Sequence, residues 1–149
     1  MAHTSNVAVL NGPNLNMLGM REPDIYGHNT LADIEAKCRL MAAERHMVID
    51  WFQSNLEGDL IDKIQSVAGS ADWIIINAAG LTHTSVALRD ALSLFPGGVI
   101  EVHLSNIHAR ESFRHTSLIS AVAKGVIAGF GTASYYMAID AISYLQLET

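Results

Sequence analysis

The chain has very little cysteine and few charged residues. Its 149 residues include one cysteine, Cys38, and 16% charged residues, whereas charged residues make up about a quarter of an average globular domain. A single cysteine excludes an internal disulfide framework and indicates a reducing, cytoplasmic setting. No apolar run is long enough to span a bilayer, and the first residues lack the basic start and apolar segment of a secretory signal.

Basic residues are scarcer than acidic ones. The chain carries 9 Lys and Arg against 15 Asp and Glu, a formal net charge of -6 with histidine neutral. This balance disfavours a nucleic-acid backbone or an anionic membrane surface as partner, although a local basic pocket could still hold a small anion. Half of the residues are hydrophobic, which suggests apolar surface buried between subunits. The length predicts one domain over residues 1–149.

Short apolar runs alternate with helical patterns along the whole chain. Continuously apolar strands that alternate with helices are typical of a parallel sheet with both faces covered. The sequence therefore predicts an α/β fold with a parallel sheet, for which we take the flavodoxin-like strand order 2-1-3-4-5 as the working hypothesis. The predicted strands are 7–10, 47–52, 72–77, 99–104 and 126–130, and the predicted helices are 30–46, 57–67, 85–94, 116–123 and 133–147.

Three chemically unusual segments each follow a predicted strand. Residues 11–26 follow the first strand, 77–83 the third and 103–114 the fourth. These strands are neighbours in the predicted order, and ligands of such sheets bind outside the carboxyl ends of the strands. The segment 10–28 is also unusually long for a connection, which is typical of a lid or a binding loop. We expect the three segments to meet over one site.

The long loop carries Arg21 and, five residues later, Tyr26. A tyrosine has an unperturbed pKa of about 10, and lowering it by two units takes about 2.7 kcal/mol. One cation at about 4 Å supplies roughly 4 kcal/mol at an effective dielectric constant near 20, so Arg21 could make Tyr26 a base. The alternative, which composition alone favours, is a tyrosine ring that packs and an arginine that is solvated.

Glu101 and His103 lie two positions apart at the end of a predicted strand, so both side chains point to one face. A carboxylate beside an imidazole fixes its tautomer and favours its protonated form, which suits a proton donor. An ordinary buried histidine with a neighbour that satisfies it is an equally good interpretation.

The remaining polar residues allow two interpretations each. Arg110 and Arg114, with Ser105 and Asn106 before them, suit a carboxylate or phosphate, or else form a solvated helix start paired with Glu111. The turn 77–83 precedes a helix whose amides favour an anion, although Thr84 or Ser85 could simply cap that helix. The spacing of His83, His103, His108 and His115 fits no metal site. Asp90 is expected on a solvated helix face, and Cys38 in the core.

Several motifs, in register over nearly the whole chain, resemble the type II 3-dehydroquinate dehydratases. They are Leu-Asn-Gly-Pro-Asn-Leu-Asn-Met-Leu-Gly-Met-Arg-Glu-Pro-Asp-Ile-Tyr-Gly from residue 10, Asn-Leu-Glu-Gly-Asp-Leu-Ile-Asp from 55, Thr-His-Thr-Ser-Val-Ala-Leu-Arg-Asp-Ala from 82, Glu-Val-His-Leu-Ser-Asn-Ile-His-Ala-Arg-Glu-Ser-Phe-Arg-His from 101 and Gly-Phe-Gly-x-x-Ser-Tyr from 129. The resemblance implies a flavodoxin-like subunit of a homododecamer built from trimers. It implies conversion of 3-dehydroquinate to 3-dehydroshikimate with loss of water, without metal or organic cofactor.

The resemblance also implies roles for individual residues. Tyr26 as phenolate would remove the proton next to the ketone, Arg21 would keep Tyr26 ionised, and Asn14 would stabilise the enolate through a bound water. His103, oriented by Glu101, would protonate the departing hydroxyl. The implied substrate contacts are Asn77, His83, Leu104, Ser105 and Arg114, with Asp90 reaching in from an adjoining subunit; the role of Arg110 stays open.

One turn departs from the pattern of the family. The chain reads Asn-Ala-Ala-Gly at 77–80, where many members read Asn-Pro-Gly-Ala, which puts only the rigidity of the turn in question.

The sequence also allows two rival functions. One is a flavodoxin-like module that binds a nucleotide or another anion without chemistry, although the first loop lacks a compact phosphate cradle. The other is a degenerate relative kept for assembly or regulation.

Overall fold

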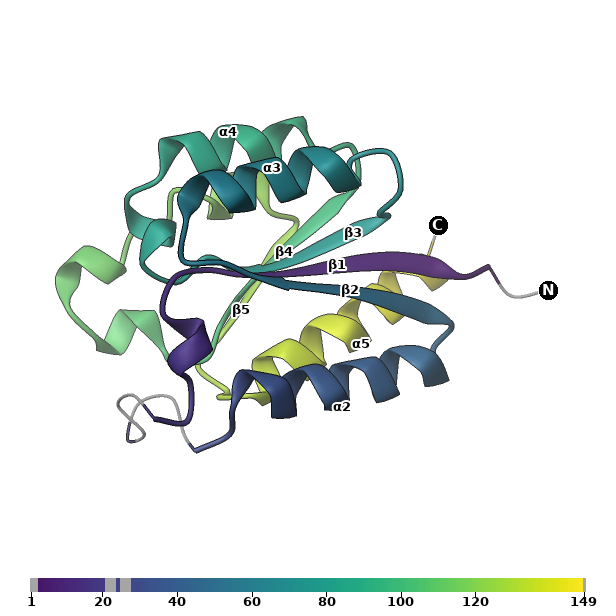
Figure 1. Ribbon diagram of the computed structural model, residues 1–149, viewed down its shortest axis with the longest axis horizontal. Helices are drawn as coiled ribbons and strands as arrows, with labels where there is room; N and C mark the ends of the chain where they lie inside the picture. The colour runs from purple at the N-terminus through teal and green to yellow at the C-terminus, as the bar shows by residue number, and fades with distance from the viewer. Residues whose placement is uncertain (1–2, 21–23, 25–27, 149) are drawn as a thin grey trace.

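A parallel five-stranded sheet forms the centre of the molecule (Figure 1). The computed structural model describes residues 3–20, 24 and 28–148. The strands lie in the order β2-β1-β3-β4-β5, and every neighbouring pair is parallel. The predicted flavodoxin-like order is confirmed. The strands are β1 (Ser5–Asn11), β2 (Met47–Gln53), β3 (Trp73–Asn77), β4 (Gly98–His103) and β5 (Gly125–Ala128).

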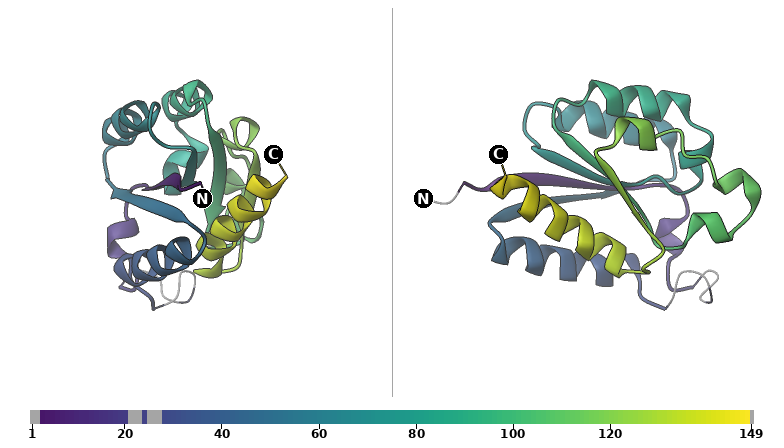
Figure 2. Two further views of the ribbon diagram at one scale, coloured as in Figure 1. Left: turned by 90° about the vertical axis from the view of Figure 1, so that its right-hand side faces the viewer. Right: turned by 180° about the vertical axis from the view of Figure 1, so that it is seen from behind.

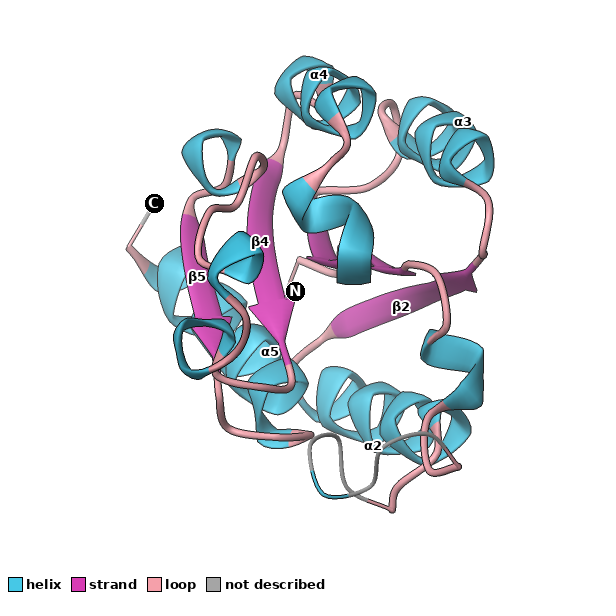
Figure 3. Cartoon of the chain, turned by 90° about the vertical axis from the view of Figure 1, so that its left-hand side faces the viewer, coloured by secondary structure: helices cyan, strands magenta, loops and turns pink. Residues whose placement is uncertain are grey.

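Helices cover both faces of the sheet, as predicted. Helices α2 (Leu31–Glu44) and α5 (Ala133–Leu147) lie side by side on one face, and α3 (Glu57–Val67) and α4 (Val86–Leu94) lie on the other (Figures 2 and 3). In the part of the chain that the structure describes, no helix is long and apolar enough to cross a membrane.

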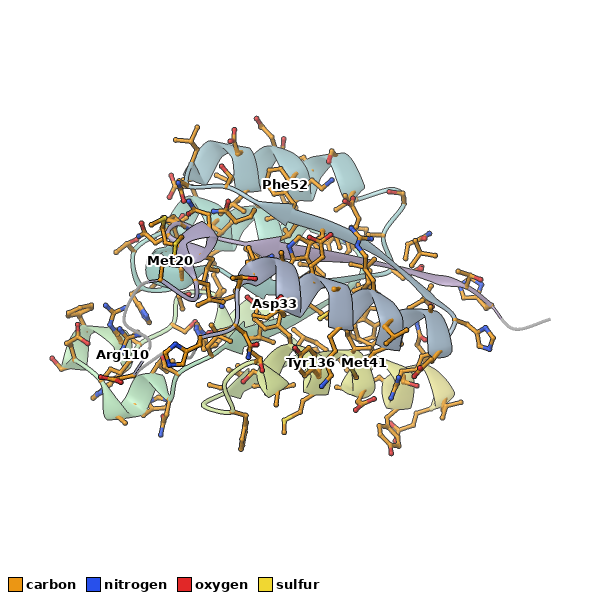
Figure 4. The ribbon with its side chains drawn as sticks, turned by 60° about the horizontal axis from the view of Figure 1, so that its bottom comes forward. Met20, Asp33, Met41, Phe52, Arg110 and Tyr136 are labelled. Atoms are coloured by element: carbon orange, nitrogen blue, oxygen red, sulfur yellow. The ribbon has the colours of Figure 1, made fainter. Side chains whose placement is uncertain are left out.

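The strands divide the core into two apolar clusters, because successive side chains of a strand point to opposite faces. On β1, Val7 and Val9 pack toward α2 and α5, whereas Ala8 and Leu10 pack toward α3 and α4. Met41 of α2 and Tyr136 of α5 pack against the first cluster (Figure 4). Burial on both faces explains why the strands read as continuous apolar runs.

Two predicted helix starts and one predicted core residue are confirmed. Thr30 Oγ1 accepts the Asp33 amide at 3.2 Å and the Thr30 amide donates to Asp33 Oδ2 at 3.0 Å, a capping box. At the start of α4, Ser85 Oγ accepts the Leu88 amide at 2.9 Å, so Ser85 and not Thr84 is the cap. Cys38 is buried, and burial raises the pKa of its thiol to about 12, as expected for a core residue.

The predicted helix over 116–123 is wrong. The segment contains only a short 3₁₀ turn, Ser120–Val122. Ser117 Oγ accepts the amides of Ile119 and Ser120 at 3.2 and 3.1 Å, and such a side-chain bond competes with helical hydrogen bonding. The Leu118 amide donates to Thr82 O at 2.8 Å, which draws the segment toward the loop after β3. The long first loop also contains an unpredicted 3₁₀ turn, Leu15–Met17.

Candidate active site

A cavity of about 170 Å³ lies at the carboxyl ends of β1, β3 and β4. The segments that follow these strands supply its walls, so the predicted convergence of three loops is observed. Figure 4 shows Arg110 at this end of the molecule. The lining residues are Pro13, Asn14, Leu15 and Leu18 after β1, Asn77, Ala79, Gly80 and His83 after β3, and His103, Leu104, Ser105, Ile107, Arg110 and Arg114 after β4.

His103 and Glu101 form a buried pair at the end of β4. Their side chains share one face, as the spacing predicts, and His103 Nε2 lies 2.5 Å from Glu101 Oε2. Glu101 is fully buried, whereas His103 also lines the cavity. Because Nε2 is held by the carboxylate, Nδ1 is the ring nitrogen that remains for a ligand. The pair therefore combines a fixed imidazole with access to the cavity.

Two serines that the sequence did not single out hold the other oxygen of Glu101. Ser117 and Ser120 donate to Oε1 at 3.1 and 2.5 Å. Burial alone would raise the pKa of Glu101, but the hydrogen bonds from His103, Ser120 and Ser117 outweigh it and lower the pKa below its usual value. The carboxylate is therefore ionised inside the core, which explains how an acid fits into an apolar strand.

Two arginines give the cavity positive charge. Arg110 Nη1 donates to Ser105 Oγ at 3.2 Å. Arg114 Nε donates to Glu111 Oε1 at 3.1 Å and the guanidinium lies 4.9 Å from the centre of the Phe113 ring. One interpretation of the sequence is that these arginines only pair with Glu111. Arg114 does pair with Glu111, but both arginines also line the cavity. A fixed guanidinium at this position suits a carboxylate ligand.

Asn77 lines the cavity, but most of its side-chain amide group is hydrogen-bonded to other residues of the fold. Its Nδ2 donates to the Tyr135 hydroxyl at 3.0 Å and its Oδ1 accepts the Ala79 amide at 3.2 Å. Tyr135, which is fully buried, donates to Asn11 Oδ1 at 2.6 Å, and burial raises the pKa of its phenol above the usual value. One N–H of Asn77 therefore remains for a ligand. The group is held in place by the neutral Tyr135, which belongs to one of the family motifs but has no role predicted from the sequence.

Replacing Tyr135 by Phe should destabilise the protein and loosen Asn77. The variant leaves buried polar groups of Asn11 and Asn77 without their partner, which costs about 1–3 kcal/mol. We expect a lower urea midpoint and a raised KM, both measured on the purified variant. The exposed Tyr144, on the same helix, provides the matched Tyr144→Phe control; equal effects of the two changes would contradict the assignment.

His83 and Asn14 are held by contacts outside the cavity. His83 Nδ1 lies 2.8 Å from Thr116 O; a carbonyl only accepts, so Nδ1 carries a proton and Nε2 of the neutral ring is an acceptor. Asn14 adopts a left-handed backbone conformation with φ of 71°, and its backbone N–H donates to Asn55 Oδ1 at 2.9 Å. These contacts fix the backbone under the Asn14 side chain and the orientation of the His83 ring.

Of the predicted site residues that the structure describes, Glu101 and Asp90 do not line the cavity. Asp90 is exposed on α4 and does not line the cavity of a single chain. Arg21 and Tyr26 lie outside the described residues. Within residues 3–20, 24 and 28–148, no group of three or more His, Cys, Asp or Glu side chains could hold a metal ion.

The turn that departs from the family pattern contains a strained alanine. Ala79 has φ of 53°, a left-handed conformation that costs a residue with a Cβ about 1–2 kcal/mol. We expect Ala79→Gly to raise the free energy of unfolding by about 1 kcal/mol, measured by urea denaturation. Ala87→Gly, on the exposed face of α4, should instead lower it by a similar amount. A loss of stability in both variants would contradict the strain.

A parallel sheet in the order 2-1-3-4-5, with helices on both faces and a cavity lined by His103 and two arginines at the carboxyl ends of its strands, defines a flavodoxin-like α/β protein. Over residues 5–143 the chain matches the family model for class II dehydroquinases, and it belongs to this family.

Relatives and solved structures agree with this assignment. A 3-dehydroquinate dehydratase of Cereibacter sphaeroides (strain ATCC 17023) is 53% identical over 142 residues, 95% of this chain and 97% of the relative. One of Brucella canis is 53% identical over 145 residues, 97% of this chain and 92% of the relative. The crystal structure of the type II dehydroquinase from Butyrivibrio crossotus superposes with a TM-score of 0.91 at 41% identity, covering 93% of this chain and 97% of that one.

Proposed function

We propose that the protein is a hydro-lyase that converts 3-dehydroquinate to 3-dehydroshikimate and water. Family membership and relatives with this printed activity, aligned over more than nine-tenths of both chains, support the substrate. The observation that carries the chemistry is the His103–Glu101 pair at the wall of a cavity that also holds two arginines.

His103 is the proton donor in this proposal. Loss of water from the substrate requires a proton for the departing hydroxyl, and an imidazolium held by a buried carboxylate can give one. Glu101 keeps Nε2 occupied, so the proton is delivered from Nδ1. After the step the neutral ring stays hydrogen-bonded to Glu101.

Tyr26 is the base in this proposal, and Arg21 stabilises its phenolate. Both residues lie outside the described chain, so their assignment rests on the resemblance of the loop motif. Tyr26 removes the proton next to the ketone, the electron pair forms an enolate, and the enolate expels the hydroxyl that His103 protonates. Asn14, at the cavity wall, stabilises the enolate through a water.

The substrate carboxylate binds at the end of β4. Arg114 and the Ser105 hydroxyl supply charge and a donor, and the backbone amides near Leu104 and Ser105 add two more. Asn77 and His83 contact the ring hydroxyls from the loop after β3. Arg110 holds Ser105, which gives it a supporting role at this end of the cavity.

Assembly and location complete the proposal. The exposed Asp90 would reach the site of an adjoining subunit in a homododecamer built from trimers, in the cytoplasm. Light scattering on the purified protein tests the assembly. A monomer with full activity would contradict the assignment of Asp90.

The direct test is turnover of 3-dehydroquinate by the purified protein, followed as the rise in absorbance of the enone product. We expect turnover without an added metal or cofactor, also after treatment with a chelator. A protein that leaves 3-dehydroquinate unchanged but binds a flavin or nucleotide in a fluorescence titration would be the non-catalytic module. A folded assembly that does neither would be the degenerate relative.

A further inference from the structure

The segment that holds Glu101 is fixed to three parts of the fold. Ser117 and Ser120 donate to Glu101 on β4. The Leu118 amide donates to Thr82 O at 2.8 Å, and Leu118 O accepts Arg89 Nη1 of α4 at 3.0 Å. Between the two serines, Ile119 is fully buried in the apolar cluster on the α3 and α4 side. The two hydroxyls are therefore carried by a segment with a fixed position.

The direction of these hydrogen bonds defines the charge of the carboxyl group. Ser117 Oγ accepts hydrogen bonds from the backbone amides of Ile119 and Ser120, which occupies both of its lone pairs. Its contact with Glu101 Oε1 is therefore one in which the Ser117 hydroxyl donates. Ser120 donates to the same oxygen, and His103 Nε2 occupies the other. Both oxygens of Glu101 face donors, so a proton on the carboxyl group would meet one of them.

We propose that Ser117 and Ser120 are positioning residues of the dehydratase, which hold the Glu101 carboxylate ionised and aimed at His103. This inference rests on the proposed function for its effect on turnover. Neither serine touches the cavity, so both act through Glu101. We call Ser117, Ser120, Glu101 and His103 the relay, because their hydrogen bonds connect the fixed segment that carries the two serines to the proton donor.

His103 is the charged or titratable partner that Glu101 faces in the described structure. On the neighbouring strands, Glu101 lies beside Ile76 of β3 and Val126 of β5, which are uncharged. Two other titratable residues lie near the segment 116–120 but contact its backbone. Arg89 of α4 binds Leu118 O, and His83 of the preceding loop binds Thr116 O. The hydroxyls of Ser117 and Ser120 therefore dominate the environment of Oε1.

The first test is the pH profile of Ser120→Ala. Protonation of Glu101 should cause a second, steeper fall of kcat at a pH below the acid limb that Tyr26 sets. Loss of one donor to a charged group should move this second fall upward by about one pH unit, because Glu101 then takes up a proton at higher pH. At the optimum we expect an about tenfold lower kcat with KM within about twofold. Ser120→Thr, which keeps the hydroxyl, should restore the profile. An equal loss at every pH would mean a merely structural role and overturn the proposal.

Matched controls separate the relay from general damage. Ser66 in α3 also donates through its hydroxyl, to Lys63 O at 2.7 Å, and Ser66→Ala should leave the profile unchanged. In a Glu101→Gln background, Ser120→Ala should lower kcat by less than about twofold, because the group it acts on has lost its charge. A further tenfold loss in that background would overturn the proposal. Ser117→Ala serves as the second variant if Ser120→Ala does not fold.

The second test does not depend on turnover. The histidine rings are labelled with ¹³C and followed by NMR against pH, with the His103 signal assigned through His103→Gln. The pH at which this signal reports protonation of Glu101 should rise by about one unit in Ser120→Ala and stay constant in Ser66→Ala. An unchanged His103 response overturns the relay even if the wild type is active. A shifted response in a protein that does not turn over 3-dehydroquinate supports the relay and rejects the proposed function.

Discussion

His103→Gln should lower kcat by about 10²–10⁴-fold, the usual contribution of a positioned general acid. Glutamine is the matched replacement, because its amide can still donate to Glu101 Oε2 where His103 Nε2 now lies at 2.5 Å. It has no proton to give to a departing hydroxyl. We expect a melting temperature close to that of the wild type and a KM within a few-fold, both measured on the same preparation.

His103→Ala separates the chemical from the structural part of the role. It removes the donor as well as the acid, so that of the partners seen in the described residues Glu101 keeps Ser117 and Ser120. Removing the partner of a buried carboxylate costs about 3–5 kcal/mol, and we expect a clear fall in melting temperature beside the loss of turnover. Near wild-type turnover in the glutamine variant would show that His103 is not the proton donor.

Tyr26→Phe should abolish turnover of 3-dehydroquinate, with a loss of about 10²–10⁴-fold in kcat. The change removes one oxygen and keeps the ring, so the fold and the assembly should be unaffected. Turnover is followed by enone absorbance, and the assembly by light scattering. If the base is a phenolate stabilised by Arg21, then Arg21→Gln should also shift the acid limb of the pH profile upward, because the phenolate loses its cation.

The control for this change is again Tyr144→Phe, at an exposed position on α5. It removes the same hydroxyl from the chain and should leave kcat unaltered. A Tyr26→Phe variant that turns over at a rate near the wild type would rule out Tyr26 as the base. The site would then need another group to remove the proton next to the ketone.

The positions of the strands follow from the sequence because burial on both faces imposes continuous apolar runs, whereas the strand order comes from the resemblance to the family. Ile74, Ile75 and Ile76 show this most clearly, since all three are buried and alternate between the two apolar clusters. The meeting of the three loops follows from the strand order. The pairing of Glu101 with His103 follows from the two-residue period of β4.

The residues behind the site could not be predicted from local patterns. In the sequence, Ser117 and Ser120 look like ordinary residues of the predicted helix 116–123. Their contact with Glu101 spans 16 and 19 positions of sequence, so no local pattern reveals it. Tyr135 and Asn11, which bond across 124 positions, lie in a helix and a strand that give no sign of a shared network. Periodicity reports which face a residue occupies, and it cannot report which distant residue it meets there.

The polar group formed by the buried Glu101 and His103 and the half-buried Ser117 and Ser120 also bears on how the chain could change under selection. It lies on the α3 and α4 side of the sheet, beside apolar residues such as Val99 and Ile119. Replacing a buried ion pair by well-packed apolar side chains is often neutral or stabilising by about 1–4 kcal/mol. Libraries screened for heat resistance alone should therefore accumulate apolar residues at these four positions, and only a screen that also demands turnover should retain them.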